Sequence, residues 1–380
     1  MPDDDTAYGD TAYDDTAYLD NAATTPVRPE ALDAMLPFLT RDFGNPSGSH
    51  RVARRAKQAI EEAREIVAAA LGVLPSEVVF TAGGTEADNL AVLGWAARGR
   101  ALCSAVEHHA VLHAVEAVGG AVVPVDGTGR VRLDALDAAL GDDVGLVSVM
   151  LANNEVGTIQ PLAEVVDLVR RRAPKALVHT DAVQAFPWLD VASLAAGADL
   201  VAVSAHKFGG PKGIGALAVR GGVALHPIVL GGGQEAGRRS GTHDVAGIAG
   251  MAAAVVATEA TRAATVALIA ARRDRLVAGL VALGAVETVP PEMKVAGNAH
   301  VRFPGVETEA LLVRLDEEGV CASAGSACAS GALEPSHVLA AMGIPSEGSV
   351  RFSLGWATTD ADIDRALAAV PRALAMRSGW

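Results

Sequence analysis

Between residues 78 and 219 the sequence alternates short, continuous apolar runs with segments of helical periodicity. The apolar runs lie at residues 78–80, 101–106, 121–125, 145–151, 176–179, 200–203 and 214–219. Helical patterns fit between them at about residues 86–98, 108–118, 133–140 and 161–172. Apolar runs without alternation are expected of strands that are covered on both faces. This order predicts an α/β fold with a mostly parallel seven-stranded sheet, which binds its ligand at the carboxyl ends of the strands.

The rest of the chain contains further helical and mixed segments. A helix is expected at residues 51–71, and one long helix, or two joined by a bend, at residues 245–283. Strand patterns at 299–303 and 349–354 and helical patterns at 308–318, 335–342 and beyond 360 indicate a smaller α+β domain. We therefore expect a large domain over residues 31–260, a small domain over residues 261–380, and a segment over residues 18–30 that joins the small domain.

The composition is that of a globular protein. Half of the 380 residues are hydrophobic, and the net charge of -14 argues against broad nucleic-acid binding. No uncharged apolar run is long enough to span a membrane, and the N-terminus has no signal-type segment, so we expect a soluble cytoplasmic protein with no membrane partner. The three cysteines lack zinc-type spacing, so we expect free thiols in a reducing compartment and no resident metal.

The first seventeen residues differ from the rest. Asp-Thr-Ala-Tyr occurs three times there, and six acidic residues but no basic residue precede Tyr18. Such a segment cannot bury enough apolar area to offset the entropy that is lost on ordering it. We therefore expect a disordered acidic tail over residues 1–17, with binding to a partner as the alternative.

One lysine is placed where covalent chemistry is possible. Lys207 follows the apolar run at residues 199–203 and precedes a glycine-rich turn. At the mouth of a sheet such a lysine can form a Schiff base with a carbonyl cofactor. A solvated loop charge or a phosphate contact is the alternative. Lys212, five residues further on, is expected to be an ordinary loop charge.

Polar residues follow other apolar runs as well. Gly83-Gly84-Thr85 opens a helix, where free backbone N–H groups favour an anion and glycine allows close approach. The alternative is a plain capped helix with Thr85 as its N-cap and Asp88 as the acid three residues further on. His108 follows the run at residues 101–106, and its ring either faces a ligand over the end of the sheet or is solvated.

Two more strand ends carry polar side chains. Asn154 lies in an Asn-Asn-Glu segment and is placed to contact a ligand, although asparagine is also a common turn former. Asp181 follows an apolar run and is costly to bury unpaired. It could hold a proton on a ring nitrogen or cap a helix. A phosphate cradle, a stacking ring, a carboxylate and a Schiff-base lysine at one sheet edge together describe a site for pyridoxal phosphate.

The cysteines differ in their surroundings. Cys328 lies within a run of very small residues at 324–331, which is expected to form a mobile loop that exposes the thiol, as suits a nucleophile. Cys103 lies inside an apolar run and is expected in the core. Cys321 follows Val320 and is expected in a strand or in the core.

The motifs, taken in order, resemble those of the cysteine desulfurases, which are class V members of the fold-type I pyridoxal-phosphate enzymes. The resemblance runs from Tyr18 to about Asp364. The matching segments are residues 18–26, 43–47, 84–86, 107–108, 153–155, 181–184, 204–215, 239–242, 325–328, 333–336 and 350–355. The Gly-Ser-Ala-Cys loop followed by Leu-Glu-Pro-Ser is similar to the group I branch of the family.

The resemblance implies a role for each candidate residue. Lys207, Cys328 and His108 would be catalytic, with Lys207 in a Schiff base with the cofactor. The residues implied to bind the cofactor phosphate are Gly84, Thr85, Ser204, His206 and, across a dimer interface, Thr242. The residues implied to contact the pyridine ring are Asp181 at its nitrogen, Gln184 at its phenolic oxygen and His108 on its face. The substrate carboxylate would be held by Asn154 and Arg351, the arginine through a bidentate fork.

The implied reaction is pyridoxal-phosphate-dependent removal of sulfur from L-cysteine, which gives L-alanine and a persulfide on Cys328. The resemblance further implies a homodimer and a sulfur acceptor, such as an iron–sulfur scaffold or a tRNA-thiolation enzyme, with a transient iron–sulfur contact at Cys328. Ala329, where many relatives have threonine, predicts a looser loop. Another class V enzyme, such as an aminotransferase or a selenocysteine lyase, and a non-catalytic sulfur-relay or scaffold protein are the alternatives. The Cys328 loop argues against a plain aminotransferase, and Lys207 with Asp181 against a scaffold.

Overall fold

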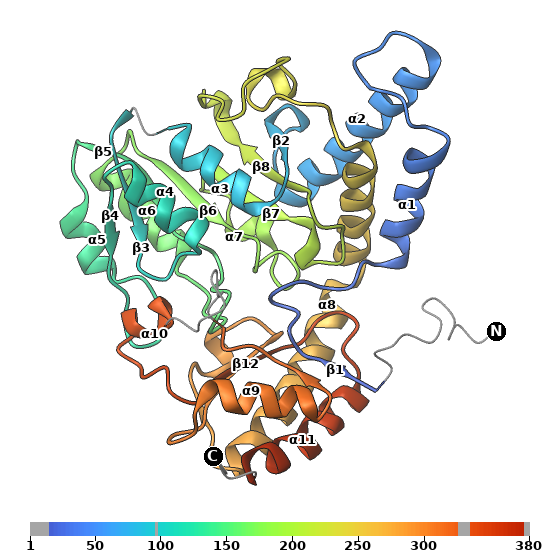
Figure 1. Ribbon diagram of the computed structural model, residues 1–380. Helices are drawn as coiled ribbons and strands as arrows, with labels where there is room; N and C mark the ends of the chain where they lie inside the picture. The colour runs from blue at the N-terminus through green and yellow to red at the C-terminus, as the bar shows by residue number, and fades with distance from the viewer. Residues whose placement is uncertain (1–14, 96–97, 326–334, 376–380) are drawn as a thin grey trace.

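A seven-stranded sheet forms the centre of the larger part of the protein (Figure 1). The computed structural model describes residues 15–95, 98–325 and 335–375. The strands of this sheet are β2 (Val78–Thr81), β3 (Arg100–Ser104), β4 (Ala121–Val123), β5 (Val144–Ser148), β6 (Leu177–Asp181), β7 (Leu200–Ser204) and β8 (Gly215–Val219). Their order is β2-β8-β7-β6-β5-β3-β4, and β8 alone among them runs antiparallel to its neighbours. The predicted fold class is therefore confirmed.

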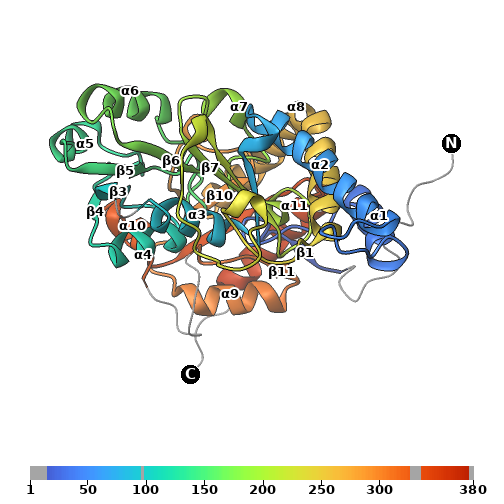
Figure 2. The same ribbon diagram turned by 90° about the horizontal axis from the view of Figure 1, so that it is seen from above.

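Helices cover both faces of this sheet, as Figure 2 shows. The helices of this part of the protein are α1 (Pro29–Thr40), α2 (Arg51–Leu71), α3 (Gly84–Leu93), α4 (His109–Ala117), α5 (Leu133–Ala139), α6 (Leu162–Arg172) and α7 (Val191–Leu194). Successive strand residues point to opposite faces. Leu102 of β3 joins a core with α2, α5 and α6, whereas its neighbours Ala101 and Cys103 join a core with α3 and α4. Both faces are buried, which explains the continuous apolar runs.

Some predicted strands end too late in the chain. The run expected to end at residue 106 leaves the sheet at Ser104, and the run expected to end at residue 151 leaves it at Ser148. The apolar residues beyond these ends, Val106, Met150 and Leu151, are buried in loops rather than in strands. Apolar character reports burial, so it does not mark where strand pairing stops.

The first turn of helix α3 differs from one of the predicted alternatives. The helix begins at Gly84, and its N-cap is Gly83 with φ of +137°. Thr85 therefore lies inside the first turn, and the alternative in which Thr85 caps the helix is wrong. Gly83 has no side chain that could cap the helix. The first N–H groups of α3 are therefore uncapped, and they face the end of the sheet.

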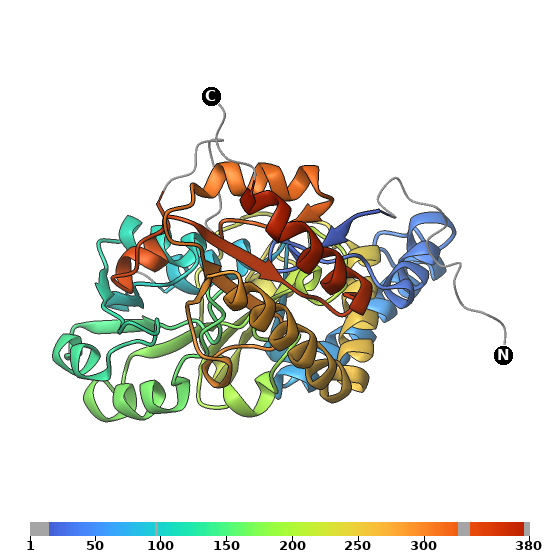
Figure 3. The same ribbon diagram turned by 90° about the horizontal axis from the view of Figure 1, so that it is seen from below.

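A smaller group of elements lies beside the main sheet (Figure 3). Strands β12 (Ser349–Ser353), β10 (Asn298–Arg302) and β9 (Val286–Glu287) form an antiparallel sheet, and β1 (Ala17–Tyr18) pairs in parallel with β11 (Val320–Cys321). The helices here are α9 (Thr308–Glu317), α10 (His337–Ala341) and α11 (Asp360–Ala375). Ala17 is fully buried in this core, so the ordered fold starts within the predicted tail, whose residues 1–14 lie outside the described residues.

One long helix, α8 (Val245–Ala282), connects the two groups. Its first part contributes Ile248 and Met251 to the core of the large sheet, and its last part contributes Leu276 and Leu280 to the small core. The prediction of one long helix is therefore confirmed, and the alternative of two helices joined by a bend is wrong. Its length and apolar composition would also suffice to cross a membrane; Ile248, Met251, Leu276 and Leu280 are buried within the fold, whereas Val256 and Leu268 in its middle are about half exposed. The predicted domain boundary at residue 260 falls inside α8, and the domain division stays a prediction.

Two glycines test how tightly the small sheet is packed. A Cβ at Gly348 (φ +66°) would overlap the carbonyl oxygen of Phe303, whereas a Cβ at Gly343 (φ +70°) would meet no atom within 4 Å. Both variants to alanine incur the strain of a positive φ, about 1–2 kcal/mol. We expect Gly348→Ala to lower the free energy of unfolding by about 2 kcal/mol more than Gly343→Ala, because a backbone atom must also move. Chemical denaturation of both variants measures this, and equal losses would contradict it.

Candidate active site

A cleft of about 390 Å³ lies at the carboxyl ends of the parallel strands. The predicted site residues that line it are Gly84, Thr85, His108, Asn154, Asp181, Gln184, Ser204, His206, Lys207 and Arg351. Thr242 is exposed and is not among the residues that line it. Cys328 lies outside the described residues. Apart from these two, the structure brings the predicted residues together from both groups of elements.

Lys207 lies directly after β7, in the short 3-10 helix Ala205–Lys207. Its Nζ donates hydrogen bonds to the carbonyl oxygen of Ala22 and to that of Ala23, the latter at 2.8 Å. Burial, with the nearby positive charge of Arg351, lowers the pKa of Lys207 to about 8. About a tenth of this amine is therefore neutral at pH 7, far more than for an ordinary lysine, and the neutral form is the one that a nucleophilic lysine requires.

His108 forms part of the cleft wall at the start of α4. It is the N-cap of this helix, and its Nδ1 accepts a hydrogen bond from the Ala110 N–H at 3.1 Å. Burial, and the positive charge of Lys207, lower the pKa of His108 to about 4. The ring is therefore neutral at physiological pH and carries its proton on Nε2, because Nδ1 accepts. His108 is half-buried and lines the cleft, which favours the ligand-facing alternative over the solvated one.

Asp181 is the last residue of β6 and is buried at the base of the cleft. Its Oδ1 accepts a hydrogen bond from the Val183 N–H at 2.8 Å, and burial raises the pKa of Asp181 to about 6. A turn follows rather than a helix, so the helix-cap alternative for Asp181 is wrong. Nearby, Gln184 donates from Nε2 to the Ala22 carbonyl oxygen at 2.8 Å. One amide N–H of Gln184 is left to meet a ligand.

Two further buried carboxyl groups lie behind Asp181, and neither was predicted as a site residue. Asp88 of α3 is 1% exposed, lines the cleft, and lies 3.5 Å from Nε2 of His179. Burial and the charge of Asp181 raise the pKa of Asp88 well above its usual value. The sequence allowed Asp88 only as a helix-capping acid. Asp88 lies three and four residues before the buried residues Ala91 and Val92, so it shares the face of α3 that is turned toward the sheet. This helical spacing is the signal that could have identified it.

Glu107 is the second of these carboxyl groups and is fully buried. It accepts hydrogen bonds from Ser104 Oγ at 2.6 Å and from the Met150 N–H at 2.8 Å. Burial nevertheless raises the pKa of Glu107 to about 8. Glu107 is therefore mostly protonated at neutral pH, and the raised pKa of Asp88 also disfavours a charge there, whereas Asp181, with its pKa of about 6, is mostly ionised.

The start of α3 forms one end of the cleft. A Cβ at Gly84 would lie 2.9 Å from Cγ2 of Val183, so the helix start needs glycine to approach this closely. Next to it is a hollow of about 380 Å³ that is lined by Thr85, Ser204 and His206, and also by Lys212. Helix N–H groups and a lysine make this hollow favourable for an anion. Lys212, expected to be an ordinary loop charge, therefore borders the site.

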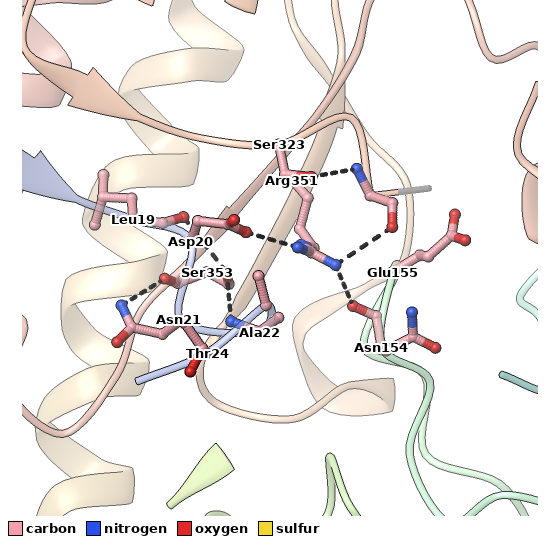
Figure 4. A network of polar contacts seen from close by, with 12 residues as sticks. Leu19, Asp20, Asn21, Ala22, Thr24, Asn154, Glu155, Ser323, Arg351 and Ser353 are labelled. Carbon is pink, nitrogen blue, oxygen red and sulfur yellow. Dashed lines mark hydrogen bonds and ion pairs between the residues drawn. The ribbon is translucent and has the colours of Figure 1, made fainter. Parts of the chain in front are cut away.

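Arg351 of β12 lines the same cleft as Lys207. It holds three segments together (Figure 4). One terminal nitrogen donates to the carbonyl oxygens of Asn154 at 3.0 Å and Gly325 at 3.4 Å, and the other donates to Oδ1 of Asp20 at 2.6 Å. Its Nε has no partner among the described residues. Arg351 is therefore already paired with Asp20, and an incoming carboxylate would share the guanidinium with that residue. The backbone of Asn154, rather than its side chain, contacts Arg351.

Comparison with known proteins places this geometry in a family. Residues 17–366 match the family described as Aminotransferase class-V. The IscS-like cysteine desulfurase of Mycobacterium tuberculosis is 47% identical over 378 residues, which cover 93% of this chain and 95% of that protein. A solved structure titled NifS-like protein has a TM-score of 0.88 at 37% identity and covers 94% of this chain and 99% of that one. A structure titled SspA in complex with cysteine has a TM-score of 0.77 at 32% identity and covers 90% and 100%.

The chain belongs to the class-V aminotransferase family, whose members depend on pyridoxal phosphate. Within that family it is one of the cysteine desulfurases, of the kind represented by the IscS and NifS-like proteins. The resemblance drawn from the motifs is thereby confirmed, as are the fold class and the enzyme class. The role of each site residue stays a prediction.

The raised pKa of Glu107 gives the protein a testable pH dependence. Because that pKa lies above the unfolded value of about 4.5, stability is lost as the pH rises through the interval up to about 8. Glu107→Gln removes this ionisation and can still accept both hydrogen bonds. We expect the variant to gain stability relative to the parent by up to about 1.4 kcal/mol for each pH unit across this interval. Denaturation at pH 5 to 9 measures the difference, with exposed Glu65→Gln as the control; a pH-independent difference would contradict the assignment.

Proposed function

We propose that this cysteine desulfurase uses pyridoxal phosphate to take sulfur from L-cysteine, releasing L-alanine and leaving a persulfide on Cys328. The observation that carries the proposal is the convergence of Lys207, Asp181 and Arg351 on one cleft. They supply an amine, a carboxylate and a guanidinium, the groups that such a reaction needs in an amino-acid site.

The residues of the cleft fit the cofactor. The neutral ring of His108 can stack on a pyridine, and the carboxylate of Asp181 can stabilise a protonated ring nitrogen. The anion-favouring hollow beside Gly84, Thr85, Ser204 and His206 suits a phosphate. Lys207 would be the residue of attachment, and Gln184 would meet the phenolic oxygen. When bound, pyridoxal phosphate supplies an electron-withdrawing ring that stabilises negative charge at the substrate Cα.

Three residues then act on the substrate. Arg351, with Asn154 beside it, orients the substrate carboxylate, and the Asp20 contact limits how far the guanidinium can turn. Nζ of Lys207, with its pKa near 8, accepts the Cα proton and later returns it. Asp181, whose pKa of about 6 leaves it ionised at neutral pH, holds the proton on the ring nitrogen opposite.

The sulfur step needs a thiolate, and the described cysteines are poor candidates for it. Burial raises the pKa of Cys103, which is 0% exposed in β3, and also that of Cys321 in β11. Cys328, in the small-residue loop, is the remaining thiol of the chain. Its thiolate attacks the substrate sulfur: an S–S bond forms, the C–S bond breaks, and the bonding electron pair leaves with the carbon skeleton that becomes alanine. The substrate is L-cysteine, consistent with the cysteine complex of the similar SspA.

The proposal extends to partners. Leu32, Leu36 and Leu39 of α1, with Phe43 beyond it, are large apolar side chains with exposures between 45% and 74%. A second copy of the chain covering this surface, with Thr242 reaching the phosphate of the partner's site, would form the homodimer. The sulfur acceptor would be a protein, such as an iron–sulfur scaffold or a tRNA-thiolation enzyme, in the cytoplasm. The net charge of -14 gives no support for a nucleic-acid partner.

Replacement of the nucleophile separates cofactor binding from sulfur transfer. We expect Cys328→Ser to retain the yellow cofactor and to lose persulfide formation, with alanine production reduced by about a hundredfold or more. Cys321→Ser is the matched control and should keep most of the activity, because this thiol is not the nucleophile. Mass spectrometry of the persulfide and an alanine assay make the measurement. A persulfide still present in Cys328→Ser would sink the assignment of Cys328.

A further inference from the structure

A second cleft lies behind Lys207, between the large and the small group of elements. Its walls come from the segment before α1 (Arg28), from α8 (Thr261 and Arg262) and from the small group (Asn298 and Trp356). Ala22, Gln184 and Lys207 line both this cleft and the active-site cleft, so they form the wall between the two. None of the residues that it adds to the active-site cleft was predicted to act in catalysis or in cofactor or substrate binding.

The charge of this cleft is one-sided. Arg28, Arg262 and Lys207 line it, and no acidic side chain is among the described residues that do. The chain as a whole carries a net charge of -14, so a cleft whose charged residues are all basic differs in sign from the protein as a whole. Arg262 is paired with Glu259, so when Lys207 is occupied by the cofactor the positive charge of the cleft is that of Arg28. Such a site favours an anion over a neutral ligand.

Among the basic residues of the cleft, Arg28 has the fewest partners to offset the cost of burying its charge. It is 8% exposed, and its Nε donates to the carbonyl oxygen of Phe208 at 3.1 Å. Its guanidinium carbon lies 4.5 Å from the ring centre of Trp356. Among the described residues no carboxylate forms an ion pair with it, and burial lowers the pKa of Arg28 in spite of the nearby charge of Glu30. A buried guanidinium without a carboxylate is costly, which a bound anion would offset.

Three more polar atoms in the cleft lack a partner within the described part of the chain. They are Nε of Arg262, Nε1 of Trp356 and Oδ1 of Asn298, and all three are buried. Asn298 is 3% exposed, and its amide nitrogen is occupied by the Glu155 carbonyl oxygen at 2.9 Å. Both terminal nitrogens of Arg262 bind Glu259, which leaves Nε unpaired. Two donors and one acceptor are thus left for a ligand.

The free space in the cleft is narrow. About 30 Å³ is open to the centres of water-sized molecules, which is room for about two waters. The indole rings of Trp188 and Trp356 are among the walls. A flat group of about three heavy atoms fits such a slot, whereas a tetrahedral phosphate would need more room in each direction. The size therefore favours a carboxylate among the common anions.

We propose that this cleft is a second ligand site, which binds the carboxylate group of a small molecule between Arg28, Arg262 and the indole N–H of Trp356. The site is separate from Arg351, which serves the active-site cleft. Because it joins the segment before α1, α8 and the small group, its occupant would bridge the two parts of the protein. Because Lys207 forms part of its wall, the charge of the occupant would also act on the active-site amine.

The test uses formate as the probe and formamide as its neutral isostere, with the cofactor-loaded protein at constant ionic strength. Tryptophan fluorescence reports on Trp188 and Trp356, and the cofactor absorbance reports on the active site separately. We expect saturable binding of formate, and no saturable binding of formamide. Thr261→Glu places a carboxylate at the exposed rim and should weaken formate binding by about tenfold or more, whereas the matched Thr261→Gln should change it by less than about twofold.

A second pair of variants tests the buried charge. Arg28→Met should abolish the fluorescence response to formate, and Arg41→Met, at a side chain that is 72% exposed, should leave it unchanged. The proposal is overturned if formamide binds as formate does, or if Thr261→Glu binds formate like the parent. It is also overturned if Arg28→Met responds to formate like the parent, because formate would then be binding elsewhere, for example at Arg351.

Discussion

The contact between Lys207 and the carbonyl oxygens of Ala22 and Ala23 is the interaction on which the site depends. It joins the end of a central strand to a segment that runs beside the small sheet, where Asp20 and Asn21 meet Ser353. Gln184 reinforces the same segment through Ala22. The reactive amine is therefore held by the backbone of a different part of the chain. The geometry of the cleft follows from how the two groups of elements meet.

Burial then gives each ionisable group its protonation state. The pKa of Lys207 falls to about 8 and that of His108 to about 4, while the pKa of Asp181 rises to about 6 and that of Glu107 to about 8. The outcome at neutral pH is a partly neutral amine, a neutral ring and one ionised carboxylate in a common cleft. The protonation of Glu107 and the raised pKa of Asp88 reduce the negative charge that would otherwise collect around Asp181.

Much of this could be read from the sequence, because the signals were local. Gly72 ends α2 in a left-handed conformation (φ +64°), and the continuous apolar runs correspond to strands buried on both faces. Lys207 and Asp181 were found because each follows such a run. Asp88 was missed because a carboxylate inside a helix looks solvated until the helix is placed on the sheet. Arg28 and Trp356 were missed because their significance arises only where segments more than 300 residues apart meet.

The central claim is that Lys207, and no other lysine, anchors the cofactor. Reduction of the purified protein with borohydride fixes such an attachment, and peptide mapping by mass spectrometry then locates it. The account predicts one modified peptide, with the pyridoxyl phosphate group on Lys207. Modification of Lys212 instead, which borders the adjoining hollow, or no modification of any lysine, would contradict it.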